Sequence, residues 1–147
     1  MSNQFFQRDA NFVPITNLGL VATKTITYSA LTTGAVGLTT LFTVMGAVGV
    51  RLFGVCSVDL TGSGTLEAGI SGNTAALLAQ TTGTAIDANE VWIDTAPATV
   101  EALPAIQIIG AGQDIIQTIG TDTLTAGTLT YYCLWTPLST DGNVVAA

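Results

Sequence analysis

Histidine is absent from this chain of 147 residues, and lysine and arginine together number only three. Without histidine, a serine or cysteine triad of the ordinary kind cannot form, and zinc lacks one of its two main protein ligands. A phosphate backbone is usually held by several Lys or Arg side chains, and an anionic membrane surface attracts the same residues. The composition therefore argues against most enzyme chemistry, against nucleic-acid partners and against peripheral membrane binding.

Charge of either sign is scarce, because charged residues make up 9% of the chain where an ordinary soluble domain has about 25%. Ten acidic residues leave a net charge of −7, while 25 threonines and 16 glycines supply much of the polar and flexible content. A surface with so little charge is either covered by uncharged polar side chains or buried against partners. The second possibility indicates a subunit of an assembly.

Motifs for phosphate and cofactor binding are also missing. Neither a G-x-G-x-x-G fingerprint nor a P-loop occurs, and residues 110–112 (Gly-Ala-Gly) have no basic residue beside them. Cys56 and Cys133, the two cysteines, lie in apolar runs, which favours buried free thiols over a single disulfide. We expect no cofactor, no metal and no small-molecule substrate.

Two segments bear on membranes and targeting. The first residues lack a basic region followed by an apolar run, so they do not resemble a secretory signal. Residues 25–50 carry no charge and are long enough for a transmembrane helix. Their many threonines and glycines favour strand, turn and strand instead, although a membrane helix stays as the alternative.

Alternation of apolar and polar residues predicts a series of short strands. In two of them one face is clearly apolar: Val48, Val50, Leu52, Cys56 and Val58 in the first, and Leu129, Tyr131, Cys133 and Trp135 in the second. Residues 74–80 fit either a strand or one helical turn, and residues after 143 read as a small apolar tail. Strands are expected at residues 23–28, 41–45, 48–58, 65–70, 91–93, 105–109, 114–119 and 128–136.

Eight or nine strands separated by Gly, Ser, Asn and Pro turns, with no helical period, indicate an all-β fold. We predict a single β-sandwich or jelly-roll-like domain at residues 18–147, preceded by an extended N-terminal arm at residues 1–17. The arm contains Phe5, Phe6 and Phe12. These aromatic side chains either contact a partner or fold back onto the core of their own chain.

An acidic segment is the one candidate for metal binding. Asp87, Glu90, Asp94 and Glu101 lie within residues 87–101, and their oxygens, with that of Asn89, suit Ca²⁺. The spacing does not match an EF-hand, and a solvated loop is the alternative. Trp92 lies in the same segment and is either an exposed stacking surface for sugar or a packed aromatic, while Trp135 is expected in the core.

Two runs of sequence resemble a known class of proteins: VRLFGVCSVDLTGSGTLEAGISGNTAALLAQTT at residues 50–82 and TAGTLTYYCLWTPLSTDGNVVAA at residues 125–147. They are similar to small virion proteins of tailed bacteriophages, most of all to head decoration (capsid cement) proteins. The resemblance covers most of the chain from about residue 39 onward. No catalytic signature is part of it.

The resemblance implies a β-rich, often trimeric subunit on the outer surface of a capsid, with no enzyme activity. Its implied partners are the major capsid protein and further copies of itself, and its location is the virion after synthesis in the host cytoplasm. A terminal arm commonly grips the shell in such proteins, which here corresponds to residues 1–17 with Phe5, Phe6 and Phe12. The alternatives are a neck, tail or fibre subunit of a phage, and a calcium-dependent carbohydrate-binding module.

Overall fold

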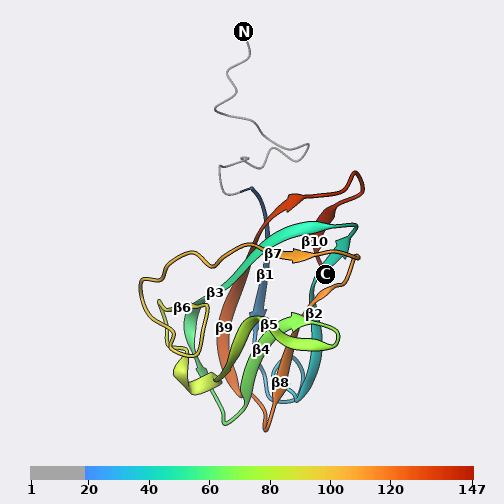
Figure 1. Cartoon of the computed structure of the whole chain (residues 1–147). Coiled ribbons are helices and arrows are strands. Elements are labelled where there is room, and N and C mark those ends of the chain that lie inside the picture. The colour runs from blue at the N-terminus through green and yellow to red at the C-terminus, as the bar shows by residue number, and fades with distance from the viewer. Residues whose placement is uncertain (1–18) are drawn as a thin grey trace.

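The computed structural model describes residues 19–147, whose regular secondary structure is almost entirely β-strand (Figure 1). Among these residues, a short 3-10 turn lies at Gly83–Ala85. The predicted all-β class is confirmed. The strands are β1 (Leu20–Thr27), β2 (Gly37–Met45), β3 (Val48–Thr61), β4 (Thr65–Ile70), β5 (Asn73–Thr82), β6 (Val91–Trp92), β7 (Gln107–Ile109), β8 (Ile115–Gly120), β9 (Ala126–Pro137) and β10 (Asn143–Ala146).

The strands form two antiparallel sheets of five strands each within the described residues. The first has the order β1-β9-β3-β6, with β7 also paired to β3, and the second has the order β10-β2-β8-β4-β5. The chain passes from one sheet to the other at most connections, so neighbours in sequence lie in different layers. The apolar faces of the two sheets enclose one core, which gives a sandwich-like body.

The two longest strands, β3 and β9, pair with each other and set the inward and outward faces of the first sheet. The four residues predicted to face inward from β9 are all buried. In β3 the prediction is right as far as Cys56 and wrong for Val58, which is 53% exposed. The register shifts between Cys56 and Val58, and such a bulge moves the following side chains to the other face.

Three further expectations are resolved by the fold. The segment at residues 74–80 is part of β5, so the strand alternative is confirmed. The predicted apolar tail is wrong, because residues 143–146 pair with β2 as β10 and bury Val144. Residues 25–50 contribute to β1, β2 and β3, and within residues 19–147 no helix has the length and apolar character of a membrane span.

A polar cluster lies inside the sandwich. The hydroxyls of Tyr28 and Tyr131 both donate to Oε1 of Gln117, at 2.9 Å and 2.8 Å. Gln117 lies on β8 and Tyr131 on β9, so these bonds join the two sheets through the core. The rings of Trp92 and Tyr131 meet edge to face with their centroids 6.2 Å apart. Burial raises the pKa of both tyrosines, because the buried environment disfavours the charged phenolate.

We predict that the protein loses stability in alkaline solution. Unfolded cysteine ionises near 9.0 and tyrosine near 10.0, whereas burial raises the pKa of Cys133 to about 12 and that of Tyr28 and Tyr131 above the ordinary value. The unfolded chain therefore releases protons first as the pH rises. The free energy of unfolding should be constant between about pH 6 and pH 8 and should fall above about pH 9, by about 1.4 kcal/mol per pH unit for each ionising group.

Urea unfolding followed at a series of pH values checks this, and Cys133→Ala is the matched control. That variant removes one early-ionising group, so its free energy of unfolding should fall less steeply between about pH 9 and pH 10. An unfolding free energy that stays constant up to about pH 11 would contradict the buried placement of these groups.

Candidate interaction surface

The outward side chains of β1, β9 and β3 form one continuous surface, which we call the β9 face. The register of the three strands determines which residues belong to this face. Threonine dominates it on β1 and β9, while β3 supplies apolar side chains and one arginine. The members are Val21, Thr23, Thr25 and Thr27 from β1, Thr128, Thr130, Tyr132, Leu134 and Thr136 from β9, and Gly49, Arg51, Phe53 and Val55 from β3.

Four threonines of the β9 face bond to one another in pairs across the strands. Thr25 Oγ1 lies 2.9 Å from Thr130 Oγ1, and Thr27 Oγ1 lies 3.3 Å from Thr128 Oγ1. Each such cross-strand pair contributes on the order of 0.2–1 kcal/mol relative to alanine. Because these hydroxyls already have partners, covering the face with an apolar surface costs less than covering free hydroxyls would.

A pocket opens at the β3 side of the β9 face. Phe53 stacks on Tyr132 of the neighbouring strand, with ring centroids 5.2 Å apart and planes 9° apart. The pocket has a volume of about 180 Å³. Its walls come from β3, from β6, from the loop that follows β6 and from the segment before β7: Phe53, Val91, Ile93, Glu101, Ala102, Leu103 and Pro104.

An apolar patch lies at the end of the β9 face where β1 begins. A Cβ atom at Gly49 would lie 3.1 Å from Ile106 Cγ2, 3.4 Å from Thr136 Cγ2 and 4.0 Å from Leu138 Cδ1, so these side chains already cover the buried glycine. We call Ile106, Ile108 and Leu138 the Gly49 patch. Ile106 and Leu138 are 53% and 54% exposed, and Ile108, which pairs with Gly49, is 72% exposed. Large aliphatic side chains thus gather around a position that has none.

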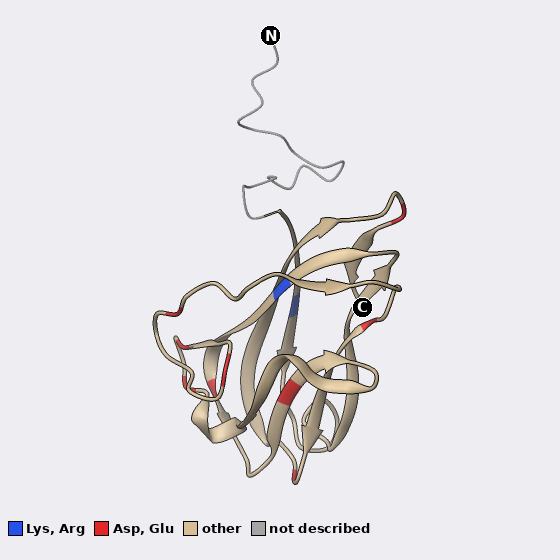
Figure 2. Ribbon diagram, in the orientation of Figure 1, with Lys and Arg blue, Asp and Glu red and all other residues tan. Residues whose placement is uncertain are grey.

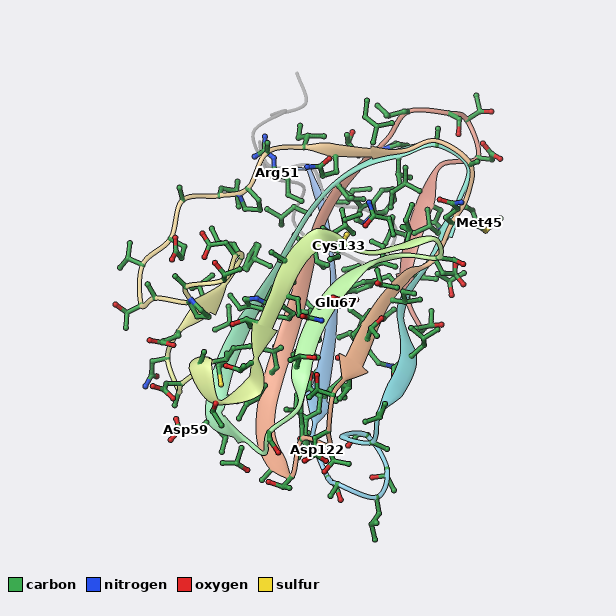
Figure 3. The ribbon with its side chains drawn as sticks, turned by 60° about the horizontal axis from the view of Figure 1, so that its bottom comes forward. Met45, Arg51, Asp59, Glu67, Asp122 and Cys133 are labelled. Atoms are coloured by element: carbon green, nitrogen blue, oxygen red, sulfur yellow. The ribbon has the colours of Figure 1, made fainter. Side chains whose placement is uncertain are left out.

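Charge is nearly absent from the β9 face. Figure 2 shows most acidic residues in loops and none on β1 or β9. Arg51 is the one charged residue of the face, and its Nε is buried without a hydrogen-bond partner among residues 19–147. In Figure 3 its side chain lies beside the segment that leads into β7. Lys24, the other described cation, points to the other side of β1 and donates to the carbonyl oxygen of Ala147.

The outer face of the second sheet has a different chemistry. Glu67 lies on β4 and accepts hydrogen bonds from Thr74 Oγ1 and from Gln80 Nε2, the latter at 3.1 Å. Figure 3 shows this carboxylate in the middle of the sheet nearest the viewer. The two outer faces therefore differ. The second sheet presents a hydrogen-bonded carboxylate, and the first sheet presents threonine and apolar residues.

The residues predicted to contact a partner, Phe5, Phe6 and Phe12, lie outside the described residues. The arm at residues 1–17 therefore stays a prediction. The sequence did place Phe53 and Tyr132 on outward faces, but it could not pair them, because the register between β3 and β9 is a property of the fold. The gathering of Ile106 and Leu138 at Gly49 had no signal in the sequence, since the three positions are far apart along the chain.

The acidic segment forms a loop in which carboxylates accept bonds from backbone amides. Glu90 Oε2 accepts from the amide of Asp87 at 3.0 Å, and Asp94 Oδ1 accepts from the amide of Ala96 at 2.7 Å. In the described part of the chain, no three Asp, Glu or Cys side chains come close enough to hold a metal ion. The arrangement supports the solvated-loop alternative over the calcium site.

The aromatic and thiol candidates are in the core. Trp92 is fully buried and Trp135 nearly so, which confirms the packed alternative for both tryptophans. Cys56 and Cys133 are free and buried, as predicted. Burial raises the pKa of both thiols, so they stay protonated at neutral pH and are poor nucleophiles.

Comparisons of this chain with protein-family models, with curated proteins and with solved structures gave no match.

We predict that Phe53 and Tyr132 stabilise each other by about 1 kcal/mol beyond their separate burial. A double-mutant cycle with Phe53→Ala, Tyr132→Ala and the double variant measures this coupling by urea unfolding. The pair Val55→Ala and Thr130→Ala, one step along the same two strands, is the matched control and should couple more weakly. Equal coupling in the two cycles would show that the stack adds nothing specific.

Proposed function

We propose that this chain is a structural virion protein that decorates and stabilises the outer surface of a tailed-phage capsid. Its partners are the major capsid protein and further copies of itself in a homotrimer, and it catalyses no reaction. The observation that carries the proposal is the β9 face, which extends over three adjacent strands with a single charge. The buried centre of a protein interface is depleted of charge in the same way.

The proposal includes a finer description of the fold as a jelly roll. If β7 and β10 are set aside, the sheet orders are β1-β9-β3-β6 and β2-β8-β4-β5. In each sheet, a strand from the first part of the chain pairs with one from the last part: β1 with β9, and β2 with β8. Strands that are closer in sequence, β3 with β6 and β4 with β5, lie beside these pairs. Eight strands in two sheets wound in this manner are typical of jelly rolls, which occur in viral capsid and lectin domains. This likeness supports a coat protein.

Multiple copies compensate for a weak single contact. A face with a single charge gains little from long-range attraction, so one subunit binds slowly and through short-range packing. A trimer that engages three sites turns the second and third contacts into intramolecular events, which raises the overall affinity by about 10²–10⁴. The predicted arm with Phe5, Phe6 and Phe12 adds apolar contact area to each site.

The experiment uses heads assembled without this protein, to which purified full-length protein is added and bound copies are counted after sedimentation. Thr25→Lys places a charge on the β9 face and should weaken binding about tenfold or more, since a buried lysine there has no partner. Ala75→Lys adds the same charge to an exposed position of β5 and should bind like the unmodified chain.

Deleting residues 1–17 should leave a folded protein that no longer binds heads. Circular dichroism verifies that each variant keeps its strands. If Thr25→Lys coats heads normally while Ala75→Lys does not, the second sheet is the contact face and the assignment of the β9 face is wrong.

The alternative is a neck, tail or fibre subunit of a phage, in which the β9 face would also contact a neighbouring subunit. Copy number separates the two. A decoration protein occupies a lattice and should be present at hundreds of copies per particle, while a neck or fibre subunit is present at a few tens or fewer, as symmetry dictates. Quantitative mass spectrometry of purified virions gives the number, and a count of about a dozen would favour the runner-up.

A further inference from the structure

β1 is an edge strand, and half of its backbone groups point away from the sheet. It is the end strand of the order β1-β9-β3-β6, so in the described part of the chain only β9 pairs with it. The amide of Tyr28 donates to the carbonyl oxygen of Gly127, so the even-numbered residues of β1 are the ones that exchange hydrogen bonds with β9. The amides and carbonyls of Val21, Thr23 and Thr25 therefore point toward the open edge.

One end of this open edge is already covered. Thr33 Oγ1 donates to the carbonyl oxygen of Thr27 at 2.6 Å. This bond agrees with the direction of the odd-numbered residues, and it places the turn after β1 beside Thr27. The part of the edge that stays open is therefore residues 21–25, in which Thr23 and Thr25 have exposed side chains.

The other edge strands among residues 19–147 are protected in ways that β1 is not. β6, β7 and β10 have only two, three and four residues. β5 is longer, but its register with β4 shifts twice. Short strands and bulges are two of the features that prevent sheet edges from pairing with one another. β1 has eight residues, no proline and an unbroken register with β9.

Charge does not protect the edge of β1 either. An inward-pointing charge on an edge strand opposes pairing, because pairing would bury that charge without a partner. Lys24 is the one charged residue of β1, and its ammonium group already donates to the carbonyl oxygen of Ala147. Figure 2 shows no acidic residue on β1. Two copies of this edge can therefore meet without direct repulsion, although the chain has a net charge of −7.

We propose that β1 pairs antiparallel with β1 of a second copy, with Thr23 opposite Thr23. Val21 then lies opposite Thr25 of the second copy. The groups that point toward the open edge meet in this register, and each such pair of residues exchanges two hydrogen bonds. A register centred on Lys24 would place two ammonium groups opposite each other, which is destabilising. A register centred on Thr25 would require the covered residue Thr27 to take part.

A second copy is favoured as the occupant because β1 complements itself. Around a two-fold axis at Thr23, each outward amide of one copy meets an outward carbonyl of the other. The side chains brought together are valine and threonine, which pair well across strands. The axis is perpendicular to the sheet, so the β9 faces of the two copies lie on the same side and form one wider face.

This pairing extends the assembly beyond a homotrimer. A two-fold contact cannot close a ring of three, so the β1 pair joins a subunit of one trimer to a subunit of the next, with both β9 faces toward the same shell. That statement rests on the proposed function. The pairing itself does not, since it takes place between copies of the isolated protein.

Disulfide crosslinking of the full-length protein tests the register. The native Cys56 and Cys133 are buried and stay out of the reaction. Thr23→Cys should form a disulfide-linked dimer on mild oxidation, because the Cα atoms of opposite residues in such a pair are about 5.5 Å apart. Thr27→Cys, an exposed position on the same side of β1, is the matched control. It should form no dimer, because it lies roughly 27 Å from its counterpart.

A mixture of two variants tests the direction of the strands. Val21→Cys and Thr25→Cys should each form no dimer alone, because each residue lies roughly 14 Å from its own counterpart, which a disulfide cannot span. An equal mixture of the two variants should form the crosslinked dimer, since these residues lie opposite each other in the proposed register.

Sedimentation equilibrium measures the contact without a crosslink. Thr23→Pro removes the central amide donor of the open edge and leaves the hydrogen bonds to β9 in place. It should reduce the mass of the assembly by about half, because each two-fold pair separates. Thr23→Val keeps the amide and the shape of the side chain and should keep the mass. Circular dichroism verifies that both variants retain their strands.

Three results would overturn the proposal. The first is a folded Thr23→Cys protein that forms no dimer on oxidation. The second is a dimer of Val21→Cys alone and of Thr25→Cys alone, which would indicate parallel strands. The third is a Thr23→Pro protein with the same mass as Thr23→Val. Head binding is not measured in these experiments, so failure of the proposed function leaves their results unchanged.

Discussion

The pairing of β9 with β1 on one side and β3 on the other is the constraint on which the rest of the structure depends. Because side chains alternate along a strand, this register determines at once what enters the core and what faces outward. Tyr131, Cys133 and Trp135 enter the core, where Tyr131 reaches Gln117 of the second sheet. The residues between them build the β9 face. A slip by one residue would expose the aromatic core and bury the threonines.

The β9 face is distinguished by the near absence of charged residues on its strands. Threonine satisfies its hydroxyl through the neighbouring strand and presents a methyl group, so a threonine ladder is polar in composition and weakly hydrated in practice. Apolar side chains on β3 extend this surface toward the Gly49 patch, where Ile106, Ile108 and Leu138 are exposed. Most carboxylates lie in loops, Asp59 lies near the end of β3, and Glu67 on the second sheet has two hydrogen-bond donors. Because the sequence contains few charged residues, this surface has little charge and is suited to close contact.

Much of the fold could be predicted from sequence because β3 and β9 are long and alternate over most of their length. The strand β10 could not, since four residues after a turn carry too little pattern to distinguish a strand from a tail. Val58 was assigned to the wrong face because a β-bulge does not change the alternation of apolar and polar residues in the sequence. Gln117 was not expected in the core, because a glutamine in a strand normally indicates solvent, and its tyrosine partners come from distant segments. The Gly49 patch could not be predicted for the same reason, because its side chains come from segments that are far apart in the sequence.

The central claim is that this protein works through contact of its β9 face with a neighbouring subunit. A cryo-EM map of the assembled particle tests it most directly, because the map shows which side of the sandwich is covered. We expect β1, β9 and β3 to lie against another protein, with Thr25 and Thr130 excluded from solvent and Glu67 open to it. A map in which the β9 face is bare and the Glu67 face is covered would contradict this account.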